Sequence, residues 1–99
     1  MRRGTTPTHI FGVDVDLRDA AVIYITYRQG GKNVLEKTGE DIEVEEEEIR
    51  TTLTQADTLA FSTSGAVEIQ IRAKFPDGAA IASQVIRTSA NVILKEGVI

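Results

Sequence analysis

The chain has 99 residues, of which 41% are hydrophobic and 5% aromatic, and its formal net charge is −4. This length predicts one domain over residues 1–99, with a modest core filled mainly by aliphatic side chains. The absence of cysteine excludes disulfides and thiolate metal sites, the acidic balance argues against nucleic acid as a partner, and no apolar run approaches the ~20 residues that span a membrane.

The first elements in chain order are an arm and a short strand. Residues 1–7 carry basic side chains, but no apolar segment follows them, so they do not form a secretory signal. We expect them to form a flexible or docked arm. A short strand is predicted over residues 8–13, and Gly12 either weakens this prediction or marks a β-bulge. Residues 14–19 are polar and are expected to form a turn.

A hairpin is predicted next. A strand is predicted over residues 20–28, whose side chains would alternate between two faces. Both faces are fairly apolar, which suits a central strand. The pair Gly30-Gly31 predicts the hairpin turn, because glycine adopts positive φ without steric cost. Residues 33–38 then return as the second strand.

Two further short strands are expected over residues 41–45 and 49–54. The strand-like alternation stops at Thr54. Thr54 and Asp57, three residues later, together resemble a capping box at the start of a helix. We therefore predict one short helical turn near residues 54–60, which tucks Phe61 into the core.

The clearest strand signal lies at residues 67–75, where apolar and polar side chains alternate without a break. Such alternation predicts a half-buried strand of an antiparallel sheet. Residues 76–78 (Pro-Asp-Gly) predict a turn. Residues 79–94 are expected to form one long final strand, bent near residues 89–91.

This succession of strands and turns predicts an all-β fold, an immunoglobulin-like antiparallel β-sandwich of about seven strands. A small closed barrel is the alternative. The cysteines and tryptophan of antibody domains are absent, so the prediction concerns the architecture alone.

Little in the chain indicates catalysis. His9 is the only histidine, which excludes a histidine-rich zinc site and gives little support to a Ser-His-Asp triad, and a strand histidine on a solvated face or at an interface is favoured. The Asp14, Asp16 and Asp19 set resembles half of a calcium loop but lacks its glycine and its bidentate acid. We therefore expect no catalytic residue, no cofactor, no metal site and no enzymatic activity.

The acidic stretch at residues 40–48 allows two functional interpretations, a cation site or a carboxylate pair for glycoside hydrolysis. Consecutive strand residues point to opposite faces, so these carboxylates do not converge on one point. A solvated edge that discourages edge-to-edge pairing is the favoured interpretation.

The two ends of the sequence are the most suggestive features. Residues 91–99 are unusually apolar, which fits either a last strand that completes the core or a segment, including an apolar tail at 95–99, that packs on another subunit. The basic arm is expected either to be disordered or to lie on a neighbour's acidic surface. The candidate contact residues are Val92, Ile93, Leu94, Val98, Ile99, Arg2 and Arg3.

Four blocks of the sequence resemble small uncharacterised proteins of phages and prophages of Gram-positive bacteria. These blocks are residues 1–8 (MRRGTTPT), 16–22 (DLRDAAV), 53–61 (LTQADTLAF) and 94–99 (LKEGVI). The second block is also distantly similar to the immunoglobulin-like N-terminal domain of phage upper-baseplate proteins. The resemblance implies a virion or assembly protein of the tail, baseplate or head–tail region, and it transfers no binding residues.

The resulting expectation is a non-enzymatic structural or assembly module that contacts other phage virion proteins, or a second copy of itself, as a homo-oligomer. Its expected location is the cytoplasm of the bacterial host during assembly, and the virion thereafter. The alternative is a β-sandwich module that binds carbohydrate or a cell surface.

Overall fold

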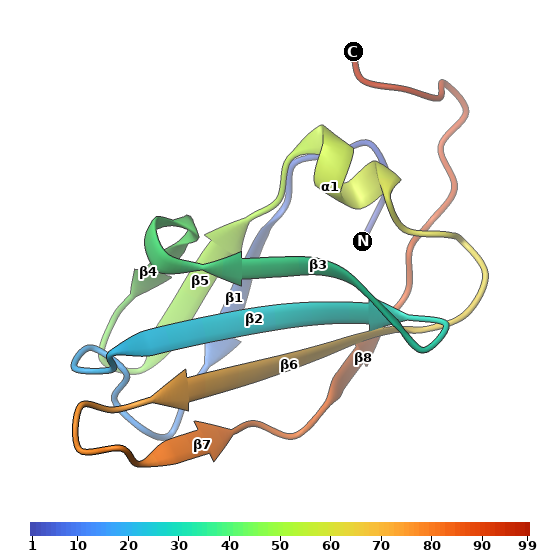
Figure 1. Cartoon of the computed structure of the whole chain (residues 1–99). Helices are drawn as coiled ribbons and strands as arrows, with labels where there is room; N and C mark the ends of the chain where they lie inside the picture. Colours follow the sequence, from blue (N-terminus) through green and yellow to red (C-terminus); the bar gives the residue numbers. More distant parts are fainter.

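Two antiparallel sheets pack face to face in the computed structural model, which describes all 99 residues (Figure 1). The smaller sheet has the order β1 (Thr8–Gly12), β5 (Glu48–Thr52), β4 (Ile42–Val44). The larger sheet has the order β3 (Lys32–Thr38), β2 (Val22–Gln29), β6 (Val67–Lys74), with β7 (Ala80–Ala82) and β8 (Ile86–Thr88) both paired to the far edge of β6. A 3-10 turn, η1 (Gly39–Asp41), leads from one sheet to the other, and one helix, α1 (Gln55–Leu59), caps an end. The prediction of an all-β sandwich is confirmed.

The core lies between the sheets, and β2 and β6 supply most of it. These two strands pair in register over their full length, so their inward side chains form two neighbouring buried rows. The alternation predicted for both strands is confirmed, because every second residue is buried. The buried residues of the two rows are Ile23, Ile25, Tyr27, Val67, Ile69, Ile71 and Ala73. Each large aliphatic side chain removed from water in this way contributes about 1.5–3 kcal/mol.

The predicted hairpin joins β2 to β3. Gly30 and Gly31 have φ values of 60° and 77°, in the left-handed region that glycine alone adopts at little cost. The turn therefore depends on both glycines, as the sequence predicts.

The short helix α1 begins with the predicted capping box. The Thr54 side chain accepts a hydrogen bond from the Asp57 backbone nitrogen at 3.0 Å, and the Asp57 carboxylate accepts one from the Thr54 backbone nitrogen at 2.8 Å. The helix ends at Leu59, and Phe61 then enters the core with 1% of its surface exposed. Both expectations for this region are confirmed.

The single long strand expected over residues 79–94 is wrong. Instead β7 and β8 are separated by three residues, Ser83, Gln84 and Val85, which lie opposite only two residues of β6, Gln70 and Ile71. This arrangement is a β-bulge, held by a hydrogen bond from the Ile71 backbone nitrogen to Ser83 Oγ at 3.0 Å. No strand follows Thr88, so the sandwich has eight strands where about seven were expected.

No helix in the structure is long and apolar enough to cross a membrane.

Candidate functional site

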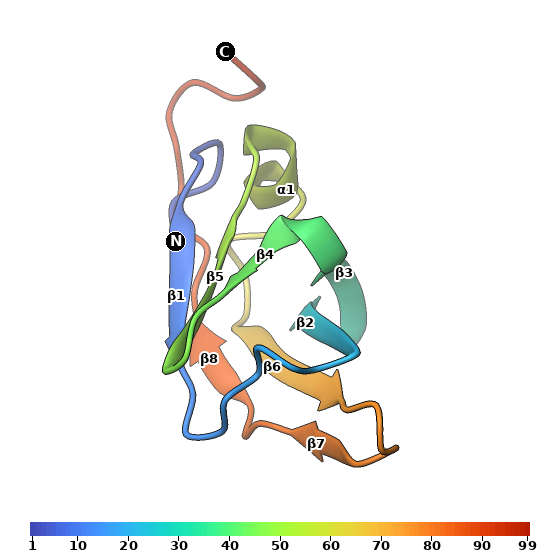
Figure 2. The same ribbon diagram turned by 90° about the vertical axis from the view of Figure 1, so that its left-hand side faces the viewer.

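Of the four strand edges that have no strand neighbour, two run along the same side of the molecule. β1 pairs only with β5, and the outer edge of β7 and β8 pairs with nothing (Figure 2). Unpaired edges present free backbone donors and acceptors and are the usual place where another chain adds to a sheet. We call the line between these two edges the seam.

One end of the seam is closed by the N-terminal arm. Residues 1–3 run parallel to residues 89–91 and exchange three backbone hydrogen bonds with them. The Met1 nitrogen donates to the Ser89 carbonyl at 2.6 Å, the Asn91 nitrogen donates to the Met1 carbonyl at 2.8 Å, and the Arg3 nitrogen donates to the Asn91 carbonyl at 3.1 Å. The arm is therefore docked on its own chain at this point.

The other end of the seam opens into a groove of about 1160 Å³. The loop after β1 forms one wall, the bulged β7–β8 edge forms the other, and Ile71 of β6 lies on the floor. The groove is lined by Gly12, Val13, Asp14, Val15, Asp16, Leu17, Glu46, Glu47, Ile71, Ile81, Ala82, Ser83, Gln84, Val85 and Ile86.

The walls of the groove combine polar residues with a group of exposed apolar side chains. Four of the ten exposed large hydrophobic side chains in the protein line it: Val15, Ile81, Val85 and Ile86, with exposed fractions between 37% and 43%. Single exposed aliphatic side chains are ordinary on a protein surface, whereas a group gathered in one hollow marks a contact surface. The bulge contributes directly, because it presents Val85 and the adjacent Ile86 to the same groove.

The rim of the groove is acidic. It carries Asp14, Asp16, Glu46 and Glu47, and of these only Asp16 makes a salt bridge, to Arg18 at 2.7 Å. The hydrogen bonds from Arg18 hold the pKa of Asp16 below its ordinary value. The remaining three carboxylates make no salt bridge, although Glu46 lies close enough to Arg18 for their charges to interact, and the excess of acidic groups favours a ligand with positive charge.

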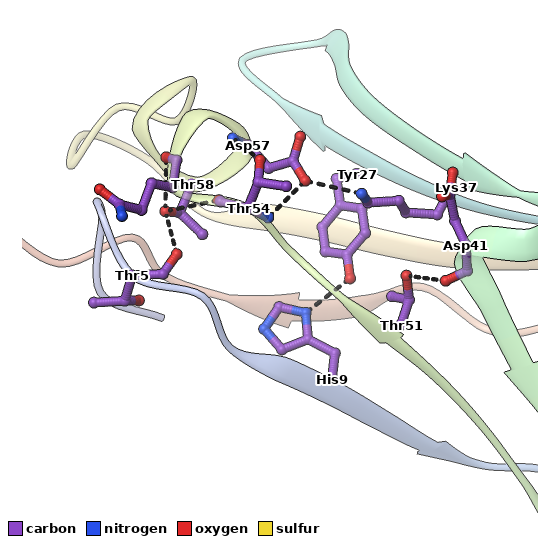
Figure 3. Close-up of polar contacts among 10 residues, drawn as sticks. Thr5, His9, Tyr27, Lys37, Asp41, Thr51, Thr54, Asp57 and Thr58 are labelled. Carbon is purple, nitrogen blue, oxygen red and sulfur yellow. Dashed lines mark hydrogen bonds and ion pairs between the residues drawn. The ribbon is translucent and has the colours of Figure 1, made fainter. Parts of the chain in front are cut away.

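A second polar cluster lies between the sheets. His9 Nδ1 and the Tyr27 hydroxyl are 2.7 Å apart (Figure 3). Burial, followed by the positive charge of the chain's amino group, lowers the pKa of His9. Burial, followed by the charge of Asp57, raises the pKa of Tyr27. The expected solvated face for His9 is wrong, because its ring is half-buried on β1 and contacts Tyr27 of the other sheet.

Lys37 and Asp57 form an ion pair near this cluster. Their charged atoms are 2.8 Å apart, and both side chains are largely buried (Figure 3). Burial alone would raise the pKa of Asp57, but hydrogen bonds from Lys37 and from Thr54 outweigh it and hold that pKa below its ordinary value. The pair ties β3 to α1, and the sequence analysis missed it.

The acidic stretch does not gather its carboxylates. Glu45 and Glu48 both pair with Arg50, at 3.4 Å and 2.9 Å, and the others are spread over η1, β4 and the turn before β5. No three His, Cys, Asp or Glu side chains in the protein are arranged to hold a metal ion. Only Glu46 and Glu47 of this stretch belong to the groove.

The candidate contact residues of the terminal segment, residues 92–99, are mostly exposed. Val92 is 60% exposed, Val98 66%, Ile99 86%, and Leu94 is completely exposed. The interpretation of residues 91–99 as a last strand that completes the core is therefore wrong, because only an isolated bridge at Asn91 continues the β pairing. Ile93 is the exception, and it lies directly over Gly4.

The two arginines of the arm contact their own chain. Arg3 donates to the Phe61 carbonyl at 2.7 Å and pairs with Glu96 at 2.7 Å, while Arg2 donates to the Val92 carbonyl at 2.6 Å. The arm therefore lies beside the terminal segment, not beside the acidic stretch.

The groove residues Val15, Ile81, Val85 and Ile86 were not foreseen as a site. One signal was present, since consecutive apolar residues at 85 and 86 break the alternation of a half-buried strand. In chemical terms the groove suits an extended peptide segment, which would find free strand edges, apolar walls and an acidic rim.

No protein-family model matches the chain, and neither a curated protein nor a solved structure shows significant similarity to it. The fold and the groove define it as an antiparallel β-sandwich with an open seam.

Proposed function

We propose that the protein is a non-enzymatic module that acts through protein–protein contacts. The observation that carries this proposal is the groove, where Val15, Ile81, Val85 and Ile86 gather between two unpaired strand edges. A free edge supplies backbone hydrogen bonds to an added segment, and apolar walls supply the burial that makes the contact stable.

We place this module in the assembly of a phage or prophage particle, in the tail, baseplate or head–tail region. That part of the proposal rests on the resemblance of four sequence blocks, since no family model, curated protein or solved structure matches the chain. An assembly role is also consistent with the exposed apolar side chains of the terminal segment, which are of the kind that subunit contacts bury.

The polar cluster supports a structural role over a catalytic one. His9 and Tyr27 bond to each other, and Lys37 bonds to Asp57, so each polar group is engaged within the fold. None of the four residues lines the groove. A general base must instead reach a proton of a bound substrate.

A carbohydrate-binding module is the alternative, and the positions of the aromatic residues argue against it. Sugar sites stack their ligands on exposed rings, but Phe11, Tyr27 and Phe61 are buried. Tyr24 is the one exposed aromatic residue, and it lies on the outer face of β2, outside the groove.

Capture of purified proteins encoded beside its gene tests the proposal. The wild type and Tyr24→Ser are expected to retain at least one such structural protein or a second copy of the chain, whereas Val85→Asp loses it. Absence of any captured protein together with absence of self-association would overturn the proposal. Glycan binding that Tyr24→Ser abolishes would favour the alternative.

A further inference from the structure

The terminal segment, residues 92–99, has side chains that complement those of the groove. Val92 and Leu94 are two residues apart and both are exposed, Leu94 completely, where the backbone bends at Leu94 and Lys95. Ile93, between them, lies over Gly4. The segment therefore offers two exposed apolar side chains, while Ile93 anchors it to its own fold.

The segment also carries a positive charge beside its exposed apolar side chains. Lys95 follows Leu94 directly, and its amine donates only to the neighbouring Glu96 carbonyl, at 3.0 Å. The groove rim carries Asp14, Glu46 and Glu47, none of which makes a salt bridge. A lysine next to two exposed aliphatic residues thus complements an apolar groove with an acidic rim.

The segment does not reach the groove of its own chain. It leaves the fold beyond α1, at the opposite end of the molecule from the loop after β1 and from β7 (Figure 1). It is also fixed there, because Ile99 exchanges two hydrogen bonds with the Gln55 side chain, at 2.8 Å and 3.2 Å, and Glu96 pairs with Arg3. The groove and the segment are thus placed to join different molecules.

We propose that residues 92–95 of one copy occupy the groove of a second copy, with Val92 and Leu94 against its apolar walls and Lys95 at its acidic rim. This inference rests on the proposed function and names a second copy of the chain as the partner. The contact uses different surfaces on the two molecules, so it is heterologous and repeats head to tail, as a ring if the rotation closes and a filament if it does not. A segment of this length makes a small interface, so the association depends on concentration.

Two substitutions separate the two halves of the contact. Val85→Asp places a charge in the groove and leaves the segment intact, and Leu94→Asp does the reverse. Both side chains are exposed in the isolated chain, so both variants are expected to fold. Each alone should weaken self-association at least about tenfold, because an aspartate is desolvated beside the acidic rim. Tyr24→Ser, on the outer face of β2, is the matched control and should associate as the wild type does.

Mixing the two variants is the decisive measurement, with light scattering after size exclusion as the readout. Val85→Asp supplies an intact segment and Leu94→Asp supplies an intact groove, so the mixture should form a one-to-one pair of twice the chain mass and grow no further. A wild type that stays monomeric across the concentration series overturns this inference and leaves the proposed function to the capture experiment. Undiminished association of Leu94→Asp, or a mixture that remains monomeric while the wild type associates, also overturns it.

Discussion

The seam between β1 and the β7–β8 edge has two ends that are built in opposite ways. At the closed end, residues 1–3 and 89–91 satisfy each other's backbone groups, and Ala90 is buried between the surrounding elements. At the open end, a bulge in the edge strand presents Val85 and Ile86 to a groove that nothing in the chain fills. The same pair of edges is thus used for stability at one end and is free for a partner at the other.

This difference follows from whether the backbone N–H and C=O groups of each end have hydrogen-bond partners within the chain. The parallel bridge at the closed end and its three backbone hydrogen bonds occupy donors and acceptors of both segments, so that part of the edge cannot accept another strand. The bulge at the open end twists its strand and interrupts the pairing with β6, and it leaves the outer side of the edge accessible. Substitutions at the closed end should therefore change the free energy of unfolding, and those at the open end should change association.

The largest expected effect comes from placing the same charge at both ends. Ala90→Asp buries a carboxylate where only 3% of the alanine is exposed, and should reduce the free energy of unfolding by about 3 kcal/mol or more. Ala82→Asp is the control, since Ala82 is exposed and Arg72 is its cross-strand neighbour, so its effect should stay within about 0.5 kcal/mol. Urea unfolding of the two variants measures the contrast, and equal losses would contradict it.

A smaller effect is expected from adding one methyl group at each end. Gly4 has φ of +73°, and a Cβ there would lie 2.8 Å from Ile93 Cδ1, so Gly4→Ala should cost about 1–2 kcal/mol. Gly12, which lines the groove, has no positive φ, and nothing lies within 4 Å of a Cβ placed there. Gly12→Ala should therefore be neutral or slightly stabilising. Thermal unfolding compares the two, and a Gly12→Ala loss as large as that of Gly4→Ala would refute the contrast.

Local sequence patterns were sufficient to predict several elements of the fold. The strand over residues 67–75, the Gly30-Gly31 hairpin and the capping box at Thr54 each depend on neighbouring residues, and all three were found as expected. Their physical causes, alternation, positive φ and a side-chain cap, are visible in a few consecutive letters.

The groove could not be predicted in the same way. One extra residue in the strand at Ser83 hardly changes the composition of residues 79–94, yet it splits the strand and creates one wall. The closure at Asn91 pairs backbone groups of residues nearly the whole chain apart, and backbone hydrogen bonds carry no sequence signature. The terminal residues were predicted as contacts from their apolar sequence, whereas the groove needs the loop after β1 and the bulge together, which lie far apart in the sequence.

The smallest expected effect is the pH dependence that His9 gives to the free energy of unfolding. His9 joins β1 to Tyr27, and its charge is influenced by the closed end of the seam. Burial and then the amino group docked at the closed end lower the pKa of His9 below its ordinary value of about 6.5, so the unfolded chain takes up a proton before the folded chain does. Stability should therefore be complete above about pH 6.5 and decline as the pH falls through the folded pKa. His9 is the only histidine, so His9→Asn should remove this decline between about pH 7.5 and 5.5 in urea titrations. An unchanged decline in that variant would assign the pH dependence to another group.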